Sequence, residues 1–252
     1  MWQARWVQSE LIKSYGGDEE RFPIKTYTTS GDTLKGELKE FGGKGLFTRE
    51  LEQALLLGEI DLAVHSMKDV PTQSQSELQI SAILKRADHR DGFISLKYKS
   101  INDLPKGALI GTASIRRRAQ LAAIRPDVKF CLLRGNVGTR LKKLADGVCD
   151  ATFLAAAGLK RLGQENDITE IVPVTSMLNA PAQGAVGIET RKDNGAVIKL
   201  LAALNHHATE MAVRAERGFL EGLDGSCRTP IAALAIYDDG LLSLTGLSLI
   251  HI

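Results

Sequence analysis

The stretch Ile60-Asp-Leu-Ala-Val-His-Ser-Met-Lys-Asp-Val-Pro71 decides the fold and points to the site. Its first part, Ile60–Val64, is predominantly apolar, as expected for a buried strand, and it runs directly into the mostly polar residues His65–Asp69. Polar side chains just past the carboxyl end of a strand are where ligands bind in open α/β sheets. We therefore expect an α/β protein with a ligand site immediately after this strand.

Helical and strand-like segments alternate on both sides of this stretch. Upstream, the pattern predicts a helix at Trp2–Ser14 closed by Gly16-Gly17, a strand at Ile24–Thr29 and a helix at Leu46–Leu57 stopped by Gly58. Downstream, it predicts strands at Leu109–Gly111, Val128–Leu133, Ala151–Ala155 and Ile231–Ile236, helices at Ser114–Ile124, Val137–Ala145 and His206–Gly222, a crossing segment at Pro173–Gly187 and a hairpin turn at Asp239-Gly240. Such alternation is typical of βαβ units with a mainly parallel sheet.

Positive charge is concentrated in the middle of the chain. The segment Thr112–Arg161 holds eleven Lys and Arg against three Asp, a net charge of +8, although the whole chain carries only +2. Three of these side chains are expected on solvated helix faces: Arg118, Lys142 and Lys143. Arg116, Arg117 and Arg134 lie at or just after strand ends, so we expect them to point into a cleft and to bind carboxylates with two-pronged geometry.

The polyanion that this segment would bind is best sought among small molecules. A nucleic-acid site needs stacking aromatic residues or a recognition helix, and the segment has only Phe130 and Phe153, both at strand positions. This makes nucleic-acid binding the weakest hypothesis. A molecule bearing several carboxylates or phosphates fits better.

Two residues are candidates for chemistry. Asp69 follows a buried strand and adjoins Lys68, so it could hold charge beside a cationic intermediate, although the spacing equally allows an Asp that only starts the turn at Val70-Pro71. Cys227 lies in a Gly-Ser-Cys-Arg loop beside a cation, which favours a thiolate and covalent chemistry. No His is close to it in sequence to act as its base.

The other motifs in the sequence are weaker indications of function. The glycine loop Gly42–Gly45 fails the spacing of a phosphate loop, and the pair His206-His207 lacks further metal ligands at suitable spacing, so we expect a structural role and no metal. Cys131 and Cys149 lie in or beside apolar strands, as inert cysteines do. Three scattered cysteines and no apolar run of about 18 residues favour a soluble protein of a reducing compartment.

Taken together, the sequence resembles the porphobilinogen deaminase (hydroxymethylbilane synthase) family over about Trp2 to Gly246. The blocks that carry the resemblance stand in the family's order: Gly42–Phe47 (GGKGLF), Ala63–Pro71 (AVHSMKDVP), Leu133–Arg140 (LRGNVGTR), Ala156–Gly163 (AAGLKRLG), Gln183–Glu189 (QGAVGIE) and Leu204–His207 (LNHH).

The resemblance implies a transferase that joins four porphobilinogen units head to tail, with release of ammonia, to give hydroxymethylbilane for haem, chlorophyll and sirohaem synthesis. It implies a dipyrromethane cofactor tied by a thioether to Cys227, which makes this cysteine an anchor, and it makes Asp69 the catalytic residue. Cofactor contacts are implied for Ser66, Lys68, Thr112, Ser114, Arg116 and Arg117. Substrate contacts are implied for Arg134, Arg140 and Arg161, and for Lys44 and Phe47 of a loop over the site.

The resemblance also implies two periplasmic-binding-protein-like α/β domains with a central cleft, followed by a small α+β domain. We expect domain 1 at residues 1–84 and 185–202, domain 2 at 90–178 and domain 3 at 207–252, with a monomer in the cytoplasm, or in the plastid stroma of a photosynthetic eukaryote. The partners expected are porphobilinogen and the growing polypyrrole chain, with neither nucleic acid nor membrane.

Both ends depart from the family's pattern. Family members begin with a strand ending in R-x-S-x-L-A before Trp2-Gln3-Ala4, and their C-terminal domain is longer. Residues 247–252 match what a sequencing-library transposon end encodes, so we expect them to be non-native. We expect a gene fragment that folds poorly, which would leave it an inactive piece of an active enzyme.

The main alternative is a two-lobed binding protein for a polycarboxylate small molecule, without catalysis. A binding protein needs neither Asp69 nor Cys227, so a dipyrromethane adduct discriminates between the two hypotheses.

Overall fold

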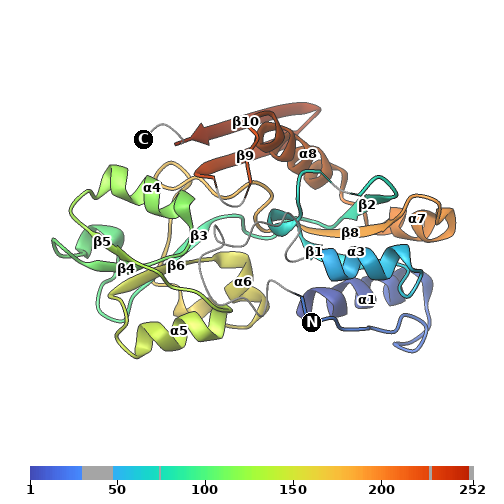
Figure 1. The fold of residues 1–252 in the computed structure, drawn as a ribbon, viewed down its shortest axis with the longest axis horizontal. Coiled ribbons are helices and arrows are strands. Elements are labelled where there is room, and N and C mark those ends of the chain that lie inside the picture. Colours follow the sequence, from blue (N-terminus) through green and yellow to red (C-terminus); the bar gives the residue numbers. More distant parts are fainter. Residues whose placement is uncertain (30–47, 74, 227–228, 250–252) are drawn as a thin grey trace.

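The structure, a computed structural model, describes residues 1–29, 48–73, 75–226 and 229–249. Two α/β lobes lie side by side, and the C-terminal helix and hairpin lie along one side of both (Figure 1). Strands in the described ranges form three sheets, with the orders β1-β8-β2, β5-β4-β6-β3-β7 and β10-β9. The predicted fold class, two α/β domains and a small α+β unit, is confirmed.

The first lobe is built on the sheet β1-β8-β2. Its elements are α1 (Trp2–Tyr15), α3 (Arg49–Leu56), β1 (Ala63–Ser66), the 3₁₀ turn η1 (Met67–Asp69), β2 (Leu78–Ile83), β8 (Val186–Arg191), α7 (Gly195–Leu201) and η4 (Ala202–Leu204). Helix α1 buries Val7 and Leu11 against Val186 and Ile188 of β8. This apolar contact joins the N-terminal helix to a strand that comes much later in the chain.

The prediction of a mainly parallel sheet is wrong for this lobe. Strand β8 pairs antiparallel with both β1 and β2. It reaches the sheet only after the chain has crossed to the second lobe and returned, so β1 and β8 are not successive strands of a βαβ unit, in which the strands are parallel. The strand predicted at residues 24–29 is also wrong, since this segment is irregular in the structure.

The second lobe is a five-stranded mixed sheet with helices around it. Its elements are β3 (Asp91–Ile94), η2 (Ile101–Asp103), β4 (Leu109–Gly111), α4 (Ile115–Ile124), β5 (Lys129–Cys131), α5 (Val137–Ala145), β6 (Ala151–Ala155), α6 (Ala156–Arg161), η3 (Glu165–Asp167) and β7 (Glu170–Ile171). Strand β4 pairs in parallel with β5 and β6, whereas β3 pairs antiparallel with β6 and β7. The expected parallel arrangement therefore holds for three strands of this lobe.

Side-chain caps fix where two helices of this lobe begin. Ser114 accepts from the N–H of Arg117 at the start of α4, and Asn136 accepts from the N–H of Thr139 at the start of α5. Both caps follow parallel strands, so the loops β4–α4 and β5–α5 open at the same edge of the sheet. That edge faces the first lobe (Figure 1).

Two crossing segments connect the lobes, at residues 84–90 and 173–185. They run against each other: the N–H of Ala87 donates to Gly184 O over 3.2 Å, and the N–H of Leu84 donates to Val186 O over 3.0 Å. Gly184 has a φ of 89°, and a Cβ there would lie 2.7 Å from Ala87 O. Only glycine allows the two backbones to approach this closely.

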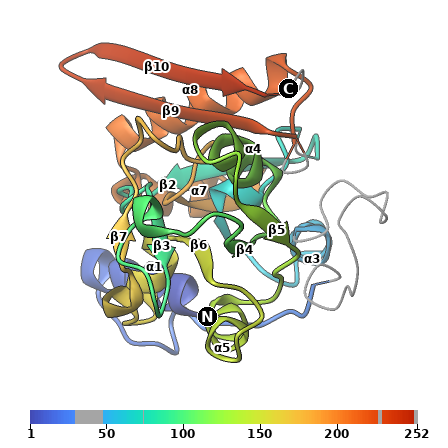
Figure 2. The same ribbon diagram turned by 90° about the vertical axis from the view of Figure 1, so that its left-hand side faces the viewer.

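A buried glutamate attaches the C-terminal unit to both crossing segments. Glu216 of α8 (His207–Gly222) is fully buried and accepts from the Arg86 guanidinium, from the N–H of Ala182 and from the N–H of Ala235. Ala235 belongs to β9 (Ile231–Asp238), which forms a hairpin with β10 (Leu241–Ser248) on α8 (Figure 2). Because a buried carboxylate needs several donors, this contact joins three parts of the chain.

A second buried carboxylate, Asp91 at the start of β3, holds α4 against the sheet. It accepts from Arg116 Nη2 over 2.8 Å, from Arg117 Nη2 over 2.7 Å and from Gln183 Nε2 over 2.9 Å. Burial by itself would raise the pKa of the Asp91 carboxyl, but the two guanidinium groups outweigh it and hold the pKa well below its usual range. Asp91 therefore stays ionised.

Gly187 of β8 allows Met67 to pack beneath the turn η1. A Cβ at this position would overlap the Met67 sulfur. Met67 itself is buried. The Met67 side chain can therefore pack here only because residue 187 has no side chain.

We predict that Gly187→Ala lowers the free energy of unfolding by about 1–3 kcal/mol, because the added methyl group forces Met67 to move. Gly218→Ala is the control, since it lies within α8 with no atom within 4 Å of an added Cβ, and it should raise stability by up to about 1 kcal/mol. Urea unfolding of both variants checks this, and equal stabilities would contradict it.

Asp91→Asn should lower stability by about 3–5 kcal/mol at pH 7, because two buried guanidinium groups lose their counter-charge. The folded pKa of Asp91 lies below its unfolded value of about 3.9, so the charge contributes stability above about pH 4. That contribution is lost as the pH falls from about 4 toward the folded pKa. Urea unfolding from pH 7 to pH 3 should therefore show the two proteins converging, and a constant difference would count against this.

Candidate active site

Lys68 and Asp69 stand on the short turn that ends β1. The backbone of this turn is anchored by the N–H of Met67, which donates to Ala185 O over 3.1 Å, and closed by the N–H of Val70, which donates to Met67 O over 3.3 Å. Lys68 and Asp69 are exposed, whereas Met67, the first residue of the turn, is buried. Two side chains of opposite charge are thus presented on a turn whose base is fixed.

The Asp69 carboxylate is not used to build the turn. The turn is closed by backbone groups, and within the described ranges no hydrogen bond involves this carboxylate. Asp69 instead lines a cavity of about 320 Å³ together with Lys68 and Arg140. Of the two roles that the sequence left open, the geometry leaves this carboxylate available for chemistry.

The second lobe contributes Arg140 to the same cavity, and Arg134 is close enough to Arg140 to affect its charge. Arg134 follows β5, and Arg140 lies on α5, where its Nε donates to Gly135 O over 2.7 Å. Burial, Arg117 and Arg134 together lower the pKa of Arg140 to about 10, and Asp69 opposes this shift. Neither Arg134 nor Arg140 forms an ion pair with a residue in the described parts of the chain. Their charges are therefore available to an anion between the lobes.

Lys68 interacts electrostatically with Asp69, Arg117 and Arg140. Desolvation lowers the pKa of the Lys68 ammonium, Asp69 raises it, and Arg117 lowers it further. The Lys68 side chain is open to the solvent between the lobes, so the desolvation effect is weaker than it would be in a closed interior. Charged groups of both signs, Asp69 and Asp91 with Arg117 and Arg140, thus act on the Lys68 ammonium.

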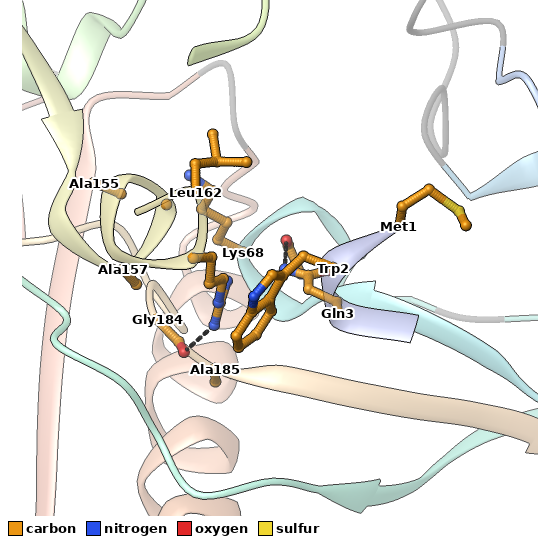
Figure 3. Close-up of a pocket in the computed structure, with 12 residues that line it drawn as sticks. Met1, Trp2, Gln3, Lys68, Ala155, Ala157, Leu162, Gly184 and Ala185 are labelled. Carbon is orange, nitrogen blue, oxygen red and sulfur yellow. Dashed lines mark hydrogen bonds between the residues drawn. The ribbon is translucent and has the colours of Figure 1, made fainter. Parts of the chain in front are cut away.

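A second cavity, of about 280 Å³, is also lined by Ser66 and Lys68 (Figure 3). Arg161 lines it, donates from Nη2 to Gly184 O over 2.9 Å and lies 5.8 Å from the centre of the Trp2 ring. Ser66 Oγ accepts from Gln3 Nε2 over 2.7 Å. Ser66 and Lys68 line both cavities, so the two are adjacent along the cleft.

Thr112 and Ser114 lie in the loop between β4 and α4. Thr112 Oγ1 accepts from the N–H of Ser114 over 3.1 Å, and Ser114 caps α4. Both hydroxyl groups therefore help to shape the edge of the second lobe that faces the cleft.

The expectation that Arg116 and Arg117 extend into the cleft is wrong. Both are buried, at 5% and 6% exposure, and bind Asp91 together. Their remaining Nη atoms donate to Leu178 O and Phe153 O. The predicted two-pronged carboxylate contact exists, but its acceptor is internal, because the first turn of α4 packs over the start of β3. Sequence reasoning missed Asp91, which lies 25 residues upstream of Arg116 with no local motif around it.

Several predicted residues lie outside the described residues: Lys44, Phe47 and Cys227, with the glycine loop Gly42–Gly45. Of the remaining motifs, His206 caps α8 by accepting from the N–H of Thr209, as a structural histidine would. Burial raises the pKa of the Cys149 thiol to about 11 and also raises that of Cys131, which fits unreactive cysteines.

The donors in the cleft suit a bound group that carries several carboxylates. Lys68, Arg134, Arg140 and Arg161 form no ion pair within the described ranges, and Arg117 Nε is a buried donor without a hydrogen-bond partner there. Uncompensated cations and an unpaired donor both favour an anionic occupant. No group of three potential metal-binding side chains occurs in the part of the chain that the structure describes. In the same part, no helix has the length and apolar character needed to span a bilayer.

Two family models match most of this chain. Residues 1–199 match the family model described as porphobilinogen deaminase, dipyromethane cofactor binding domain, and residues 211–249 match that of the porphobilinogen deaminase C-terminal domain. The porphobilinogen deaminase of Paracoccus denitrificans (strain Pd 1222) is 51% identical, over 97% of this chain and 78% of that protein. That of Geobacter sulfurreducens is 49% identical, over 98% of this chain and 77% of that protein.

Among solved structures, protein PG110 from Staphylococcus aureus is 15% identical with a TM-score of 0.46, over 98% of this chain and 91% of that one. An ancestral arginine-binding protein is 16% identical with a TM-score of 0.40, over 87% of this chain and 81% of that one. On the two family models and the identity of about one half to the bacterial relatives, this chain belongs to the porphobilinogen deaminase family.

Proposed function

We propose that this chain condenses four porphobilinogen molecules, with loss of ammonia at each step, into linear hydroxymethylbilane for tetrapyrrole biosynthesis. The observation that carries the proposal is the meeting of one exposed carboxylate, Asp69, with cations from both lobes that have no counter-charge in the described ranges. Membership of the family supports the same reaction.

The cations suit the substrate because each pyrrole unit brings an acetate and a propionate. The bound chain therefore becomes more negative as it grows. Arg140 and Arg161, with Lys68, would offset this charge from the two cavities, and Arg134 would add to this effect from beside Arg140. Preorganised cations stabilise a growing anion without rearranging at each step.

Asp69 has the opposite task. Loss of ammonia and formation of the new carbon–carbon bond place positive charge on a pyrrole ring, and a carboxylate beside the ring stabilises that charge. Lys68 and Arg140 line the same cavity as the Asp69 carboxylate. The Asp69 carboxylate can thus stabilise the positive charge on the ring, while the cationic side chains around it bind the carboxylates that the ring carries.

We assign the dipyrromethane to the same cleft, with its thioether at Cys227. When bound, this group supplies the fixed pyrrole end to which the first substrate is joined. Ser66 and Lys68 would contact it directly from the first lobe, and Thr112 and Ser114 from the second. Arg116 and Arg117 are buried behind the cleft. They would act on the dipyrromethane through their positive charge and through the unpaired Nε of Arg117.

The remaining predictions extend this proposal. Lys44 and Phe47 would belong to the loop over the site, and the domains would be bounded at 1–84 with 185–202, 90–178 and 207–252. A monomer in the cytoplasm, with no nucleic-acid or membrane partner, stays a prediction. The alternative of a binding protein without catalysis is disfavoured by the position of Asp69 beside cations from both lobes.

Asp69→Ala should abolish formation of hydroxymethylbilane, because the positive charge on the ring loses its counter-charge, and leave the fold intact, because the carboxylate makes no hydrogen bond within the described ranges. Asp61→Ala is the control: its carboxylate is 73% exposed and lies 4.0 Å from Arg191, so its loss should matter little. Product formation and the unfolding midpoint are measured for both. Near-normal turnover by Asp69→Ala would refute the assignment.

The mass of the purified protein should exceed the mass of the polypeptide by one dipyrromethane. The excess should disappear in Cys227→Ser and persist in Cys131→Ser, because the Cys131 thiol lies in the second lobe with a raised pKa. Intact-protein mass spectrometry decides the matter. An unmodified protein, or an adduct that survives Cys227→Ser, would contradict the proposed attachment.

A further inference from the structure

Arg217 of α8 binds the backbone immediately after Asp69. Its Nη1 donates to Val70 O over 2.9 Å, and its Nη2 donates to Pro71 O over 2.6 Å and more weakly to Thr72 O over 3.5 Å. The planar guanidinium group is well shaped to hold neighbouring carbonyl oxygens in this way. A residue of the C-terminal unit therefore holds, by hydrogen bonds, the backbone that follows Asp69.

The same helix face also contacts the base of the turn. Val213, one helical turn before Arg217, is fully buried in a cluster with Met67 and Val70. Met67 and Val70 flank the two charged residues of the turn. Lys68 and Asp69 are thus held between an apolar contact below and a hydrogen-bonded contact at the exit.

Arg217 is partly buried, with two glutamates near it. Burial lowers the pKa of its guanidinium, and Glu221 of the same helix and Glu189 of β8 raise it. Glu189 in turn lies 3.0 Å from His65 of β1. Arg217 lines neither of the two cavities of the cleft. It is therefore placed to act on the turn and not on a bound molecule.

We propose that Arg217 is a positioning residue, which fixes the turn Met67–Pro71 so that the Asp69 carboxylate stays in register with the cations of the second lobe. The proposal rests on the catalytic role proposed for Asp69. Without the guanidinium, the backbone of this turn would keep only the anchors from Met67 and Val70 within the described ranges, and the second of these is long, at 3.3 Å. The turn would then sample positions in which the carboxylate is displaced.

The test compares Arg217→Met, Arg217→Lys and Arg214→Met. Arg214 lies one turn earlier on α8, with a side chain that is 71% exposed and paired with Glu210 of the same helix, so it is a matched control. In Arg217→Met we expect kcat to fall roughly 10- to 100-fold, because displacements of about 1 Å have effects of this size. KM should be nearly unchanged, since Arg217 lines neither cavity. Arg217→Lys should recover part of kcat, because an ammonium group donates to one carbonyl but lacks the fork.

Hydrogen exchange of the backbone amides separates positioning from a general structural role. In Arg217→Met, exchange should speed up in residues 66–72 and stay unchanged in α8 and in the β9–β10 hairpin, and Arg214→Met should match the unaltered protein throughout. Normal kcat in Arg217→Met, or unchanged exchange at residues 66–72, would overturn the proposal. Loosening of α8 and the hairpin as well would overturn it in favour of a structural role.

The two proposals fail in distinguishable ways. If the unaltered protein makes no hydroxymethylbilane, the proposed function is wrong, whatever the exchange data show. If it makes the product, and Arg217→Met makes it equally fast with the same exchange pattern, the function stands and the positioning role is wrong.

Discussion

The arrangement of the molecule depends on one buried carboxylate. Glu216 is fully buried, and its two oxygens accept from the Arg86 guanidinium and from the N–H groups of Ala182 and Ala235. These donors belong to the two crossing segments and to β9. Removing any one of them would leave charge or a polar group unpaired in the interior, so none of the three segments can shift alone. The C-terminal unit is thereby part of the framework between the lobes and not an appendage.

The excess positive charge of the middle of the chain is divided between structure and site. Arg116 and Arg117 both pair with Asp91, which offsets one of their two charges, and Arg125 pairs with Asp127 over 2.7 Å. The positive charge that faces the cleft comes from the side chains that form no such internal pair. A net charge of +8 in the sequence therefore overstates what a ligand encounters, while the position of the remaining cations matters more than their number.

The sequence predicts what depends on neighbouring residues and misses what depends on distant ones. The helix at Val137–Ala145 and the strand at Ala151–Ala155 are found where they were predicted, because caps, glycines and apolar runs act locally. The position of Asp69 just after a strand can likewise be read from the local sequence, whereas its catalytic role stays a prediction. The antiparallel pairing of β8 depends on a strand more than 100 residues away, which no local pattern reveals.

Buried charges are the hardest class for such reasoning. Arg116 was expected in the cleft because an arginine after a strand end usually serves a ligand, and its true partner, Asp91, stands at the start of a strand in another part of the chain. Glu216 offered a weak signal, since it shares a helix face with Ala212 and Val213, and an acid on an apolar face indicates a buried partner. The partner itself, Arg86, could not have been read from that face.

The close approach at Gly184 has a mechanical consequence. The backbones of the two crossing segments touch there and are hydrogen-bonded at Ala87 and Leu84. They therefore act as one double-stranded strap and not as two independent linkers. A strap of this kind resists shearing and stretching more than rotation about its own length. Room for a lengthening product would thus come from swivelling one lobe on the other, a motion that changes the width of the gap while preserving the order of the groups along it.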